Sequence, residues 1–361
     1  TAMPLRRLWL TDFRNYISAD VAFGDGITAI TGLNGQGKTN LVEAIAWLAR
    51  GSSFRGAPNE ALIRSGSESA VIRAETGDGD RSTLLEVELV TKGRNRMQVN
   101  GNKVSRIRDL VGHFTATIFG PDDLALLKGG PGERRAFIDD LLVDLDPRLH
   151  TTRTNLERVL RQRNTLLRQA GGQLTTGVGD SLDIWDSKLA ETGEVLIAAR
   201  QRLVDRLSPL VDDHLGVLSG GVSNASLAYE ESWSGSSLAA ALSEARGDDL
   251  RRGTTTVGPH RDEVGITLDN LGARHHSSQG EQRSLALAMR LAGHYLVAEH
   301  TGMRPVVLLD DVFSELDPDR STALIALLPI AQAVITSAGN LPPGVVADHR
   351  YRISTGRVEV Q

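Results

Sequence analysis

Short apolar runs separated by polar turns fill the first part of the chain, a pattern that predicts β-strands. A β-branched run at 26–31 is followed by a glycine-rich loop. From Thr39 the apolar period changes, because Leu41, Ile45 and Leu48 fall at helical spacing on one face. We therefore expect a strand, a glycine-rich loop and a helix in direct succession.

The middle of the chain has a different texture. From about 122 to 244 it is dominated by Leu, Ala, Arg, Glu and Gln at helical spacing, and a glycine-rich loop at 171–179 divides it. Strand texture returns at 264–268. A long helix over 281–299 then leads into a continuous apolar strand at 306–309. This order indicates two strand-containing regions around a helical insertion.

Strands that alternate with helices at both ends predict an α/β head with a second, mainly α-helical domain inserted in it. We place the first part of the head at 3–120, the helical arm at 121–250 and the second part of the head at 251–361. The length of 361 residues agrees with two structural units.

Composition narrows the class of protein. The chain is 40% hydrophobic and 24% charged, as globular proteins usually are, and it has no cysteine for disulfides, thiolate zinc sites or nucleophiles. No apolar run approaches the ~20 residues of a membrane helix and no signal-peptide pattern opens the chain, so we expect a cytoplasmic protein. The net charge is −5, so any DNA binding needs a local basic surface.

The glycine-rich loop matches G-x-x-x-x-G-K-[ST], the Walker A pattern. Its residues are Gly32, Leu33, Asn34, Gly35, Gln36, Gly37, Lys38 and Thr39. Because it joins an apolar strand to a helix, its backbone N–H groups and the helix N-terminus are placed for phosphate. We expect Lys38 to face the β- and γ-phosphates and Thr39 to bind Mg²⁺, so ATP and Mg²⁺ are the predicted cofactors.

A carboxylate pair lies far downstream. Asp310 and Asp311 follow the apolar run at 306–309, in the arrangement called Walker B. An apolar strand that ends in two aspartates is ordinary when it stands alone, but beside a Walker A loop it is informative. We predict that Asp310 helps to hold Mg²⁺ and that Asp311 polarises the attacking water, which makes Asp311 and Lys38 the candidate catalytic residues.

A Ser-x-Gly sequence opens the long helix just before that strand. One interpretation is a plain helix cap, with Ser278 and Glu281 forming a capping box. The other is the signature loop of an ABC-type ATPase, which closes on a γ-phosphate held by another subunit. The order of Walker A, Ser-x-Gly, Walker B and then 314–317 (Ser-Glu-Leu-Asp) favours the second. Ser278 and Gly280 are therefore candidate nucleotide-binding residues.

Several segments together resemble the RecF family of bacterial recombinational-repair ATPases, which is related to the Rad50 and SMC heads. They are 10–16, the Walker A loop, 126–139 (KGGP…RR…D), 258–262 (GPHRD), 278–283 and Asp310-Asp311. They follow the family order over nearly the whole chain, and the GPHRD and KGGP segments are the more specific ones. Asp311 stands where most ABC ATPases carry Glu, and Ser337 where transporters carry a switch histidine.

The resemblance implies an ABC-type, Rad50-like P-loop ATPase head with a helical arm and no long coiled coil. It also implies an ATP-dependent head-to-tail homodimer on gapped or junction DNA, in which weak, DNA-stimulated hydrolysis acts as a switch. RecR and RecO are the implied partners in loading recombinase, near the nucleoid, during repair and the response to DNA damage. The alternative is the nucleotide-binding subunit of an ABC transporter, against which the RecF-type segments and Ser337 argue.

Two groups of basic residues are candidate DNA contacts. The first comprises Arg94, Arg96, Lys103, Arg106 and Arg108, and the second Arg148, Arg153, Arg158, Arg161, Arg163 and Arg168. Each alone is most simply a solvated side chain, but together they suit a surface that follows phosphates, because phosphate contacts need only positive charge. Arg134, Arg135, His260 and Arg261 are either structural or DNA contacts.

Overall fold

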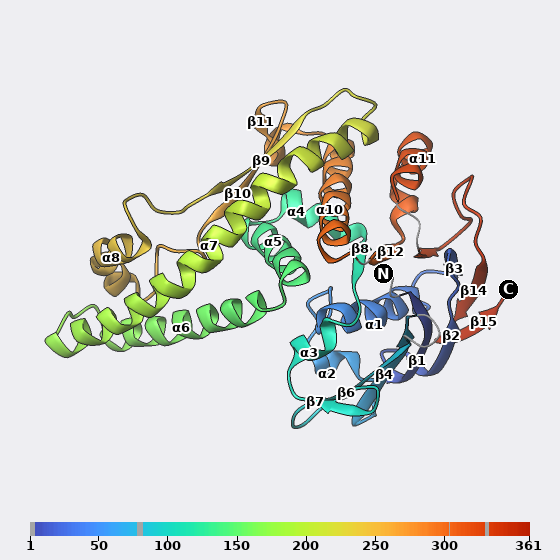
Figure 1. The fold of residues 1–361 in the computed structure, drawn as a ribbon, viewed down its shortest axis with the longest axis horizontal. Helices are drawn as coiled ribbons and strands as arrows, with labels where there is room; N and C mark the ends of the chain where they lie inside the picture. Colours follow the sequence, from blue (N-terminus) through green and yellow to red (C-terminus); the bar gives the residue numbers. More distant parts are fainter. Residues whose placement is uncertain (1–3, 78–81, 303, 329–331) are drawn as a thin grey trace. The chain divides into compact units, whose positions relative to one another are not determined.

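The computed structural model describes residues 4–77, 82–302, 304–328 and 332–361, and it divides into two compact units (Figure 1). The head consists of Thr1–Asp123, His214–Gly221 and Ala286–Gln361, and the arm of Leu124–Asp213 and Val222–Leu285. The predicted α/β class and the helical insertion are confirmed.

One sheet of the head carries the carboxyl ends on which the motifs lie. Its order is β15-β14-β3-β13-β12-β8, and all its neighbouring pairs are parallel except β14 with β15. The strands are β3 (Ile27–Thr31), β8 (Ala116–Phe119), β12 (Val306–Asp310), β13 (Ala333–Ser337), β14 (His349–Ser354) and β15 (Arg357–Val360). Because parallel strands end at one edge, the loop after β3 and the carboxylates after β12 come together there.

A second, antiparallel sheet of the head has the order β2-β1-β4-β5-β6-β7. Its strands are β1 (Leu5–Phe13), β2 (Tyr16–Ala22), β4 (Ser69–Thr76), β5 (Thr83–Val90), β6 (Arg96–Val99) and β7 (Asn102–Val104). Helix α1 (Lys38–Arg50) is buried along most of its length, and its side chains share one core with both sheets. Burial around α1 therefore fixes the helix that follows the phosphate loop.

The remaining head elements are short, apart from the ends of two long helices. They are α2 (Asn59–Leu62), α3 (Ile107–Val111), η2 (Pro121–Leu124), η3 (Val312–Glu315) and α11 (Pro318–Leu327). Of the helices that the structure describes, none is long and apolar enough to cross a membrane.

The arm is built mainly from long helices with one small sheet. Its helices are α4 (Ala125–Lys128), α5 (Pro131–Leu145), α6 (Leu149–Gln169), α7 (Thr176–Leu218), α8 (Leu238–Arg252) and α9 (Ala273–His276), and α10 (Gln279–Thr301) begins in it. Its strands are β9 (Ala225–Glu230), β10 (Glu263–Leu268) and β11 (Leu271–Gly272), in the order β11-β10-β9. The predicted helical hairpin corresponds to α6 and α7.

The boundary between the units differs from the predicted one at 250, because the arm continues to Leu285. The cause is strand pairing. Strand β10 pairs antiparallel with β9 from Glu263↔Glu230 to Leu268↔Ala225, which ties residues beyond 250 to the arm. The Ser-x-Gly loop consequently belongs to the arm, while α10 continues from it into the head.

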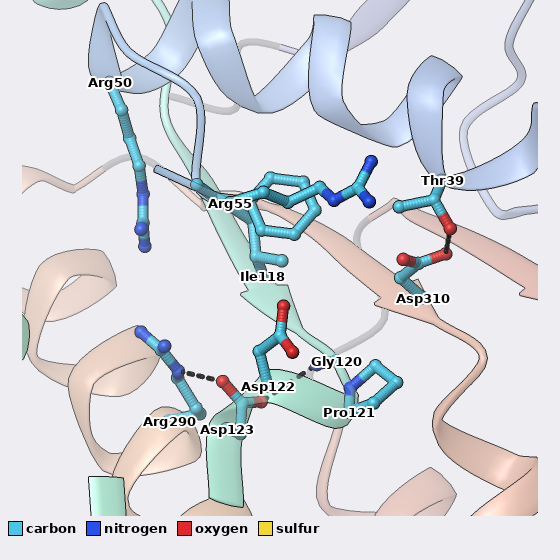
Figure 2. A pocket seen from close by; sticks show the side chains of 11 residues that line it. Thr39, Arg50, Arg55, Ile118, Gly120, Pro121, Asp122, Asp123, Arg290 and Asp310 are labelled. Atoms are coloured by element: carbon cyan, nitrogen blue, oxygen red, sulfur yellow. Dashed lines mark hydrogen bonds and ion pairs between the residues drawn. The ribbon is translucent and has the colours of Figure 1, made fainter. Parts of the chain in front are cut away.

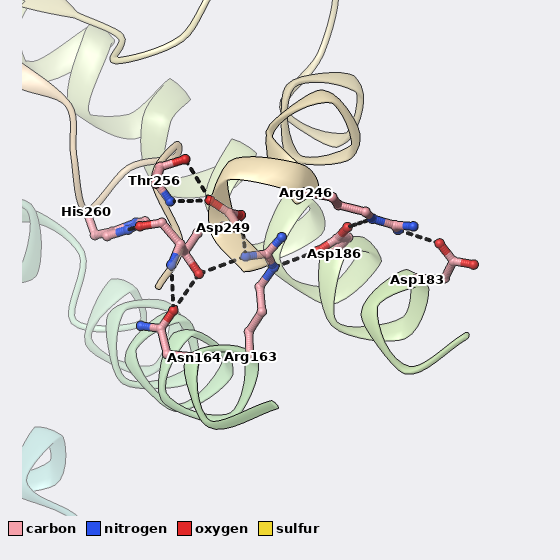
Figure 3. Close-up of polar contacts among 9 residues, drawn as sticks. Arg163, Asn164, Asp183, Asp186, Arg246, Asp249, Thr256 and His260 are labelled. Carbon is pink, nitrogen blue, oxygen red and sulfur yellow. Dashed lines mark hydrogen bonds and ion pairs between the residues drawn. The ribbon is translucent and has the colours of Figure 1, made fainter. Parts of the chain in front are cut away.

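A buried ionic cluster joins three helices of the arm (Figure 3). Arg163 on α6 has no solvent exposure, and its guanidinium donates to Asp186 on α7 at 2.6 Å and to Asp249 on α8 at 2.7 Å. Arg246 pairs with the other oxygen of Asp186 at 2.8 Å. The expectation that Arg163 belongs to a DNA-contacting surface is therefore wrong, because this position faces the interior of the arm.

Candidate functional site

The Walker A loop takes backbone conformations that glycine accommodates best. Gly32 and Gly37 have φ values of 149° and 117°. A Cβ atom on Gly32 would lie 2.4 Å from the carbonyl oxygen of Ile353, and one on Gly37 would lie 2.7 Å from the side chain of Asn15. Both glycines are thus required by close approach as well as by φ. Gly37 directly precedes α1, so the loop ends at a helix N-terminus, where unpaired backbone N–H groups favour an anion.

The turn between β1 and β2 and the turn between β14 and β15 both contact the phosphate loop. The backbone oxygen of Gln36 accepts hydrogen bonds from the Asn15 side-chain amide at 2.9 Å and from the Gly356 N–H at 3.1 Å. The Tyr16 hydroxyl donates to the backbone oxygen of Gly37 at 2.9 Å, and burial raises the pKa of this hydroxyl, which keeps it protonated. The loop is therefore braced from both sides before any ligand binds.

Lys38 is the first residue of α1 and is buried. Its ammonium donates to the backbone oxygens of Gly32 at 2.6 Å and Leu33 at 2.9 Å. An ammonium has three N–H donors, so these two contacts leave one for a phosphate oxygen. Burial lowers the pKa of Lys38, and the charges of Asp311 and Asp310 oppose that shift.

Asp310 lies at the end of β12 and joins the loop to the neighbouring strand. One of its carboxylate oxygens accepts from the Thr39 hydroxyl at 3.1 Å and from the Thr336 hydroxyl at 2.7 Å. The side chain is only 4% exposed, and burial raises its pKa, with a smaller effect from the nearby Asp311 charge. A hydroxyl and a buried carboxylate side by side suit Mg²⁺, which proteins bind through one or two carboxylates plus substrate phosphates. Within the described residues no larger cluster of metal-binding side chains occurs.

Asp311 differs from Asp310 in its backbone and surroundings. Its φ is 54°, in the left-handed region that Asp tolerates better than most residues, and its N–H donates to the Thr336 hydroxyl at 3.0 Å. The side chain is partly exposed, whereas that of Asp310 is buried. The two adjacent carboxylates therefore have separate environments, as their separate predicted roles require.

A polar cavity of about 220 Å³ lies beside the Thr39–Asp310 pair in the head (Figure 2). Asp123, which lines it, accepts from the Arg290 guanidinium at 2.8 Å and from the Gly120 N–H at 2.9 Å. This pair fixes the turn that follows β8, next to the end of β12. The volume suits water and ions rather than a whole nucleotide.

Ser278 forms the capping box that its sequence predicts. The Ser278 N–H donates to the Glu281 carboxylate at 2.7 Å, and the Glu281 N–H donates to the Ser278 hydroxyl at 3.3 Å. Ser278 and Gly280 belong to the arm, whereas Lys38, Thr39, Asp310 and Asp311 come together in the head. The capping box and a role toward a second subunit are compatible, because a capped helix start still presents N–H groups.

Thr336, Asn15 and Tyr16 contact the candidate site residues, and sequence reasoning did not single them out. Thr336 ends β13 beside β12, so only the sheet order identifies it. Asn15 and Tyr16 lie in the RecF-type segment at 10–16, which was the available signal.

Most of the candidate DNA-binding residues have ordinary ion-pair partners or remain exposed. Arg96, Arg148 and Arg153 pair with carboxylates at 2.8–3.2 Å. The Arg108 side chain lies outside the described residues.

Two residues of the KGGP and GPHRD segments make contacts within the arm. Arg134 makes two 2.8 Å bonds to the Glu263 carboxylate. His260 contacts the Thr255 backbone oxygen at 3.1 Å, and burial lowers its pKa, so the imidazole is neutral. Arg134 is buried, whereas His260 is half-buried and Arg261 is exposed.

Comparisons with known proteins agree with this geometry. The model of the RecF/RecN/SMC N-terminal domain family matches residues 4–340. The DNA replication and repair protein RecF of Streptomyces avermitilis is 42% identical over 99% of this chain and 100% of its own length, and that of Acidothermus cellulolyticus is 40% identical over the same shares. A solved structure of the recombination mediator protein RecF with ATP, from the RecFOR pathway, is 31% identical, with a TM-score of 0.91 over 100% of this chain and 98% of that one. An Smc head domain from Pyrococcus furiosus, 18% identical over 99% of this chain and 96% of that one with a TM-score of 0.58, shares the ABC-type head fold alone. The chain therefore belongs to the RecF family of DNA replication and repair proteins.

Proposed function

We propose that this chain is an ATP-dependent DNA-binding protein of recombinational repair and replication restart. In this proposal, bound ATP joins two copies head to tail on gapped or junction DNA, and slow hydrolysis releases them. The observation that carries it is the braced phosphate loop with the Thr39–Asp310 pair beside it. The family assignment favours this function over a transporter subunit.

The loop residues 32–39 would hold ATP and Mg²⁺. Backbone N–H groups at the start of α1 would bind phosphate oxygens, and Lys38 would add the N–H that its two loop contacts leave free. Thr39 and Asp310 would be the magnesium ligands, since the Thr39 hydroxyl and an oxygen of the Asp310 carboxylate already lie 3.1 Å apart. When bound, Mg²⁺ neutralises charge on the phosphates during phosphoryl transfer.

Asp311 would position the water that attacks the γ-phosphate. Its partly exposed carboxylate can accept a hydrogen bond from the attacking water, while the buried Asp310 carboxylate would bind the metal. Aspartate is one methylene shorter than the glutamate of most ABC ATPases, so its reach to the water is shorter. A slow ATPase that acts as a timer follows from that difference.

The Ser-x-Gly loop would complete the site of the other subunit. The Ser278 hydroxyl makes only a long 3.3 Å bond to its own helix, so turning toward a phosphate would cost little. The N–H groups at the start of α10 would add a second helix N-terminus to the γ-phosphate. ATP would then hold two chains together, each contributing one half of each site.

The cellular partners in this proposal are DNA, RecR and RecO. The solved relative is described as a recombination mediator protein in the RecFOR pathway. By that likeness, the dimer would mark gaps or single-strand/double-strand junctions in the cytoplasm, at the nucleoid, and help RecO and RecR to load recombinase there.

Size-exclusion chromatography with light scattering tests the proposal. We expect a monomer without nucleotide, a dimer with MgATP, and a dimer–DNA complex when gapped duplex is added. DNA affinity should also fall steeply with salt, with a slope near −4 to −5 for about five neutralised phosphates. A chain that binds ATP but stays monomeric with DNA present would refute the dimer, and salt-independent DNA binding would refute phosphate contacts.

A further inference from the structure

A polar groove runs between α6 and α7 in the arm, where the two helices lie alongside each other (Figure 1). Its volume is about 470 Å³. Its lining comes from one face of each helix: Asn155, Arg158, Val159 and Gln162 from α6, and Trp185, Lys188, Glu191 and Thr192 from α7. The lining contains no residue of the phosphate loop, of the Asp310–Asp311 pair or of the Ser-x-Gly loop, so the groove is distinct from the candidate nucleotide site.

Two cations in the groove have no carboxylate partner among the residues that the structure describes. Arg158 and Lys188 are exposed, and neither takes part in an ion pair with any residue in the described part of the chain. This contrasts with Arg153 on the same helix, which contacts both Asp140 and Glu157. The charges of Arg158 and Lys188 therefore remain available to an anion. Glu191 is the one acidic side chain among the lining residues.

An aromatic ring lies next to these charges. Trp185 is only partly buried, and the Lys188 ammonium sits 5.0 Å from the centre of its ring. By contrast, Trp47 is 1% exposed and belongs to the head core. Lys188 contacts the ring by a cation–π interaction, and the ring remains partly exposed. It offers a flat surface for stacking.

The other lining side chains are hydrogen-bonding groups of neutral charge. The amides of Asn155 and Gln162 and the hydroxyl of Thr192 form no hydrogen bonds to other residues in the part of the chain that the structure describes. Val159 is buried, so Trp185 is the large apolar side chain of the lining that remains partly exposed. A protein segment usually needs a more apolar seat than this, because the centre of an interface is depleted of charge.

We propose that the groove binds a single-stranded stretch of DNA, with phosphates at Arg158 and Lys188 and an unpaired base on the Trp185 ring. Proteins bind single strands without reading their sequence by combining positive charge along the phosphate backbone of the DNA with aromatic side chains that stack on its bases. A duplex cannot use the ring in this way, since its bases are stacked on one another. The inference rests on the proposed DNA-binding function and adds to it the site for the unpaired strand of a gap.

The contributions of charge and of stacking to binding should differ in their dependence on salt concentration. Arg158→Glu removes a phosphate contact and introduces repulsion, so it should weaken binding and reduce the salt slope by about 0.7–1. Trp185→Ala should weaken binding with the slope unchanged, because stacking releases no counterions. Glu191→Gln should tighten binding, since it removes the repelling charge.

The test is fluorescence anisotropy of the full chain with labelled oligo(dT) and, separately, with a blunt duplex of the same length. Trp185→Ala should weaken oligo(dT) binding about 5- to 150-fold, the range for loss of one stacked base, and leave duplex binding unchanged. Trp185→Phe should restore most of the affinity. The matched control is Arg252→Glu, which makes the same charge change at an exposed position on α8 in the same unit.

The outcomes are distinguishable. If the wild type binds no DNA, the proposed function fails. If the wild type binds oligo(dT) and the Arg158→Glu and Trp185→Ala variants bind it equally well, DNA binding stands and the groove assignment is wrong. Equal losses for oligo(dT) and blunt duplex, or for Arg252→Glu and Arg158→Glu, would also overturn it. If Trp185→Ala still binds oligo(dT) but no longer binds a protein partner of the wild type, the groove is the site of that partner instead.

Discussion

Arg163 and Arg158 lie five positions apart on α6, and the structure places them in opposite environments. At about 100° per residue, they are separated by about 140° around the helix. Arg163 is fully buried between Asp186 and Asp249, whereas Arg158 is exposed in the α6–α7 groove. Replacement of each by methionine, which has a similar length and no charge, should therefore give opposite results.

The effect of Arg163→Met on stability can be worked from its contacts. The change leaves the Asp249 carboxylate, itself without solvent exposure, with no cation, while Asp186 keeps its bond to Arg246. Removing one partner of a buried ion pair costs about 3–5 kcal/mol. For a unit the size of the arm, 1 kcal/mol lowers Tm by about 2–4 °C, so we expect a loss of about 6–20 °C. Arg158→Met should change the free energy of unfolding by less than about 0.5 kcal/mol.

Differential scanning calorimetry and oligo(dT) binding of the full chain measure both roles. Arg163→Met should melt early but bind DNA normally at a temperature where it is folded, and Arg158→Met should show the reverse. Asp249→Asn added to Arg163→Met should recover part of the lost stability, because it removes the uncompensated charge. A stable Arg163→Met protein with weakened DNA binding would refute the assignment of Arg163 to the interior.

The remaining predictions concern the nucleotide site. Lys38→Met should abolish ATP binding, measured by calorimetric titration, with an unchanged circular dichroism spectrum, because the glycine backbone of the loop remains. Asp311→Asn should bind ATP normally but hydrolyse it about 10²–10⁴-fold more slowly, and so should accumulate as a dimer; normal hydrolysis would show that Asp311 does not act on the water. Asp310→Asn should bind MgATP weakly yet raise Tm without nucleotide at neutral pH. A carboxyl whose pKa is raised by folding lowers stability as pH rises through the interval between its unfolded and folded pKa values, and the amide removes that effect. Because the ionised carboxylate is the form that binds Mg²⁺, MgATP affinity of the wild type should decline on acidification through the raised pKa of Asp310.

The local motifs could be predicted from the sequence because each depends on neighbours in the chain. The Walker A loop, the apolar strand before Asp310 and the capping box of Ser278 with Glu281 are of this kind. Each is recognised within about eight residues, where backbone conformation and hydrogen bonding are set locally.

Features that depend on tertiary pairing could not be predicted. The Thr336 hydroxyl reaches Asp310 only because β13 lies beside β12. The late arm boundary follows from β9 pairing with β10 over a long separation in sequence. The two helix faces that form the groove each read as ordinary amphipathic surface until α6 and α7 are paired.

Arg163 shows a limit of charge patterns on helices. It occurs in a series of arginines on α6, and an arginine in such a series is usually exposed. Its partner Asp249 lies on α8, 86 residues further along the chain. That contact, together with the one to Asp186 on α7, distinguishes Arg163 from the exposed members of the series.

The central claim is that two chains share each nucleotide site head to tail, and mixing two inactive variants tests it most directly. Lys38→Met should lack ATP binding, and Ser278→Arg should bind ATP but fail to close on a partner's nucleotide. Mixed together, they can form a pair with one intact site, which joins the Walker A loop of one chain to the Ser-x-Gly loop of the other. We predict that each variant alone neither dimerises nor hydrolyses ATP, and that the mixture does both on gapped DNA. If the mixture stays as inactive as its components, Ser278 serves the nucleotide of its own chain and the head-to-tail account is wrong.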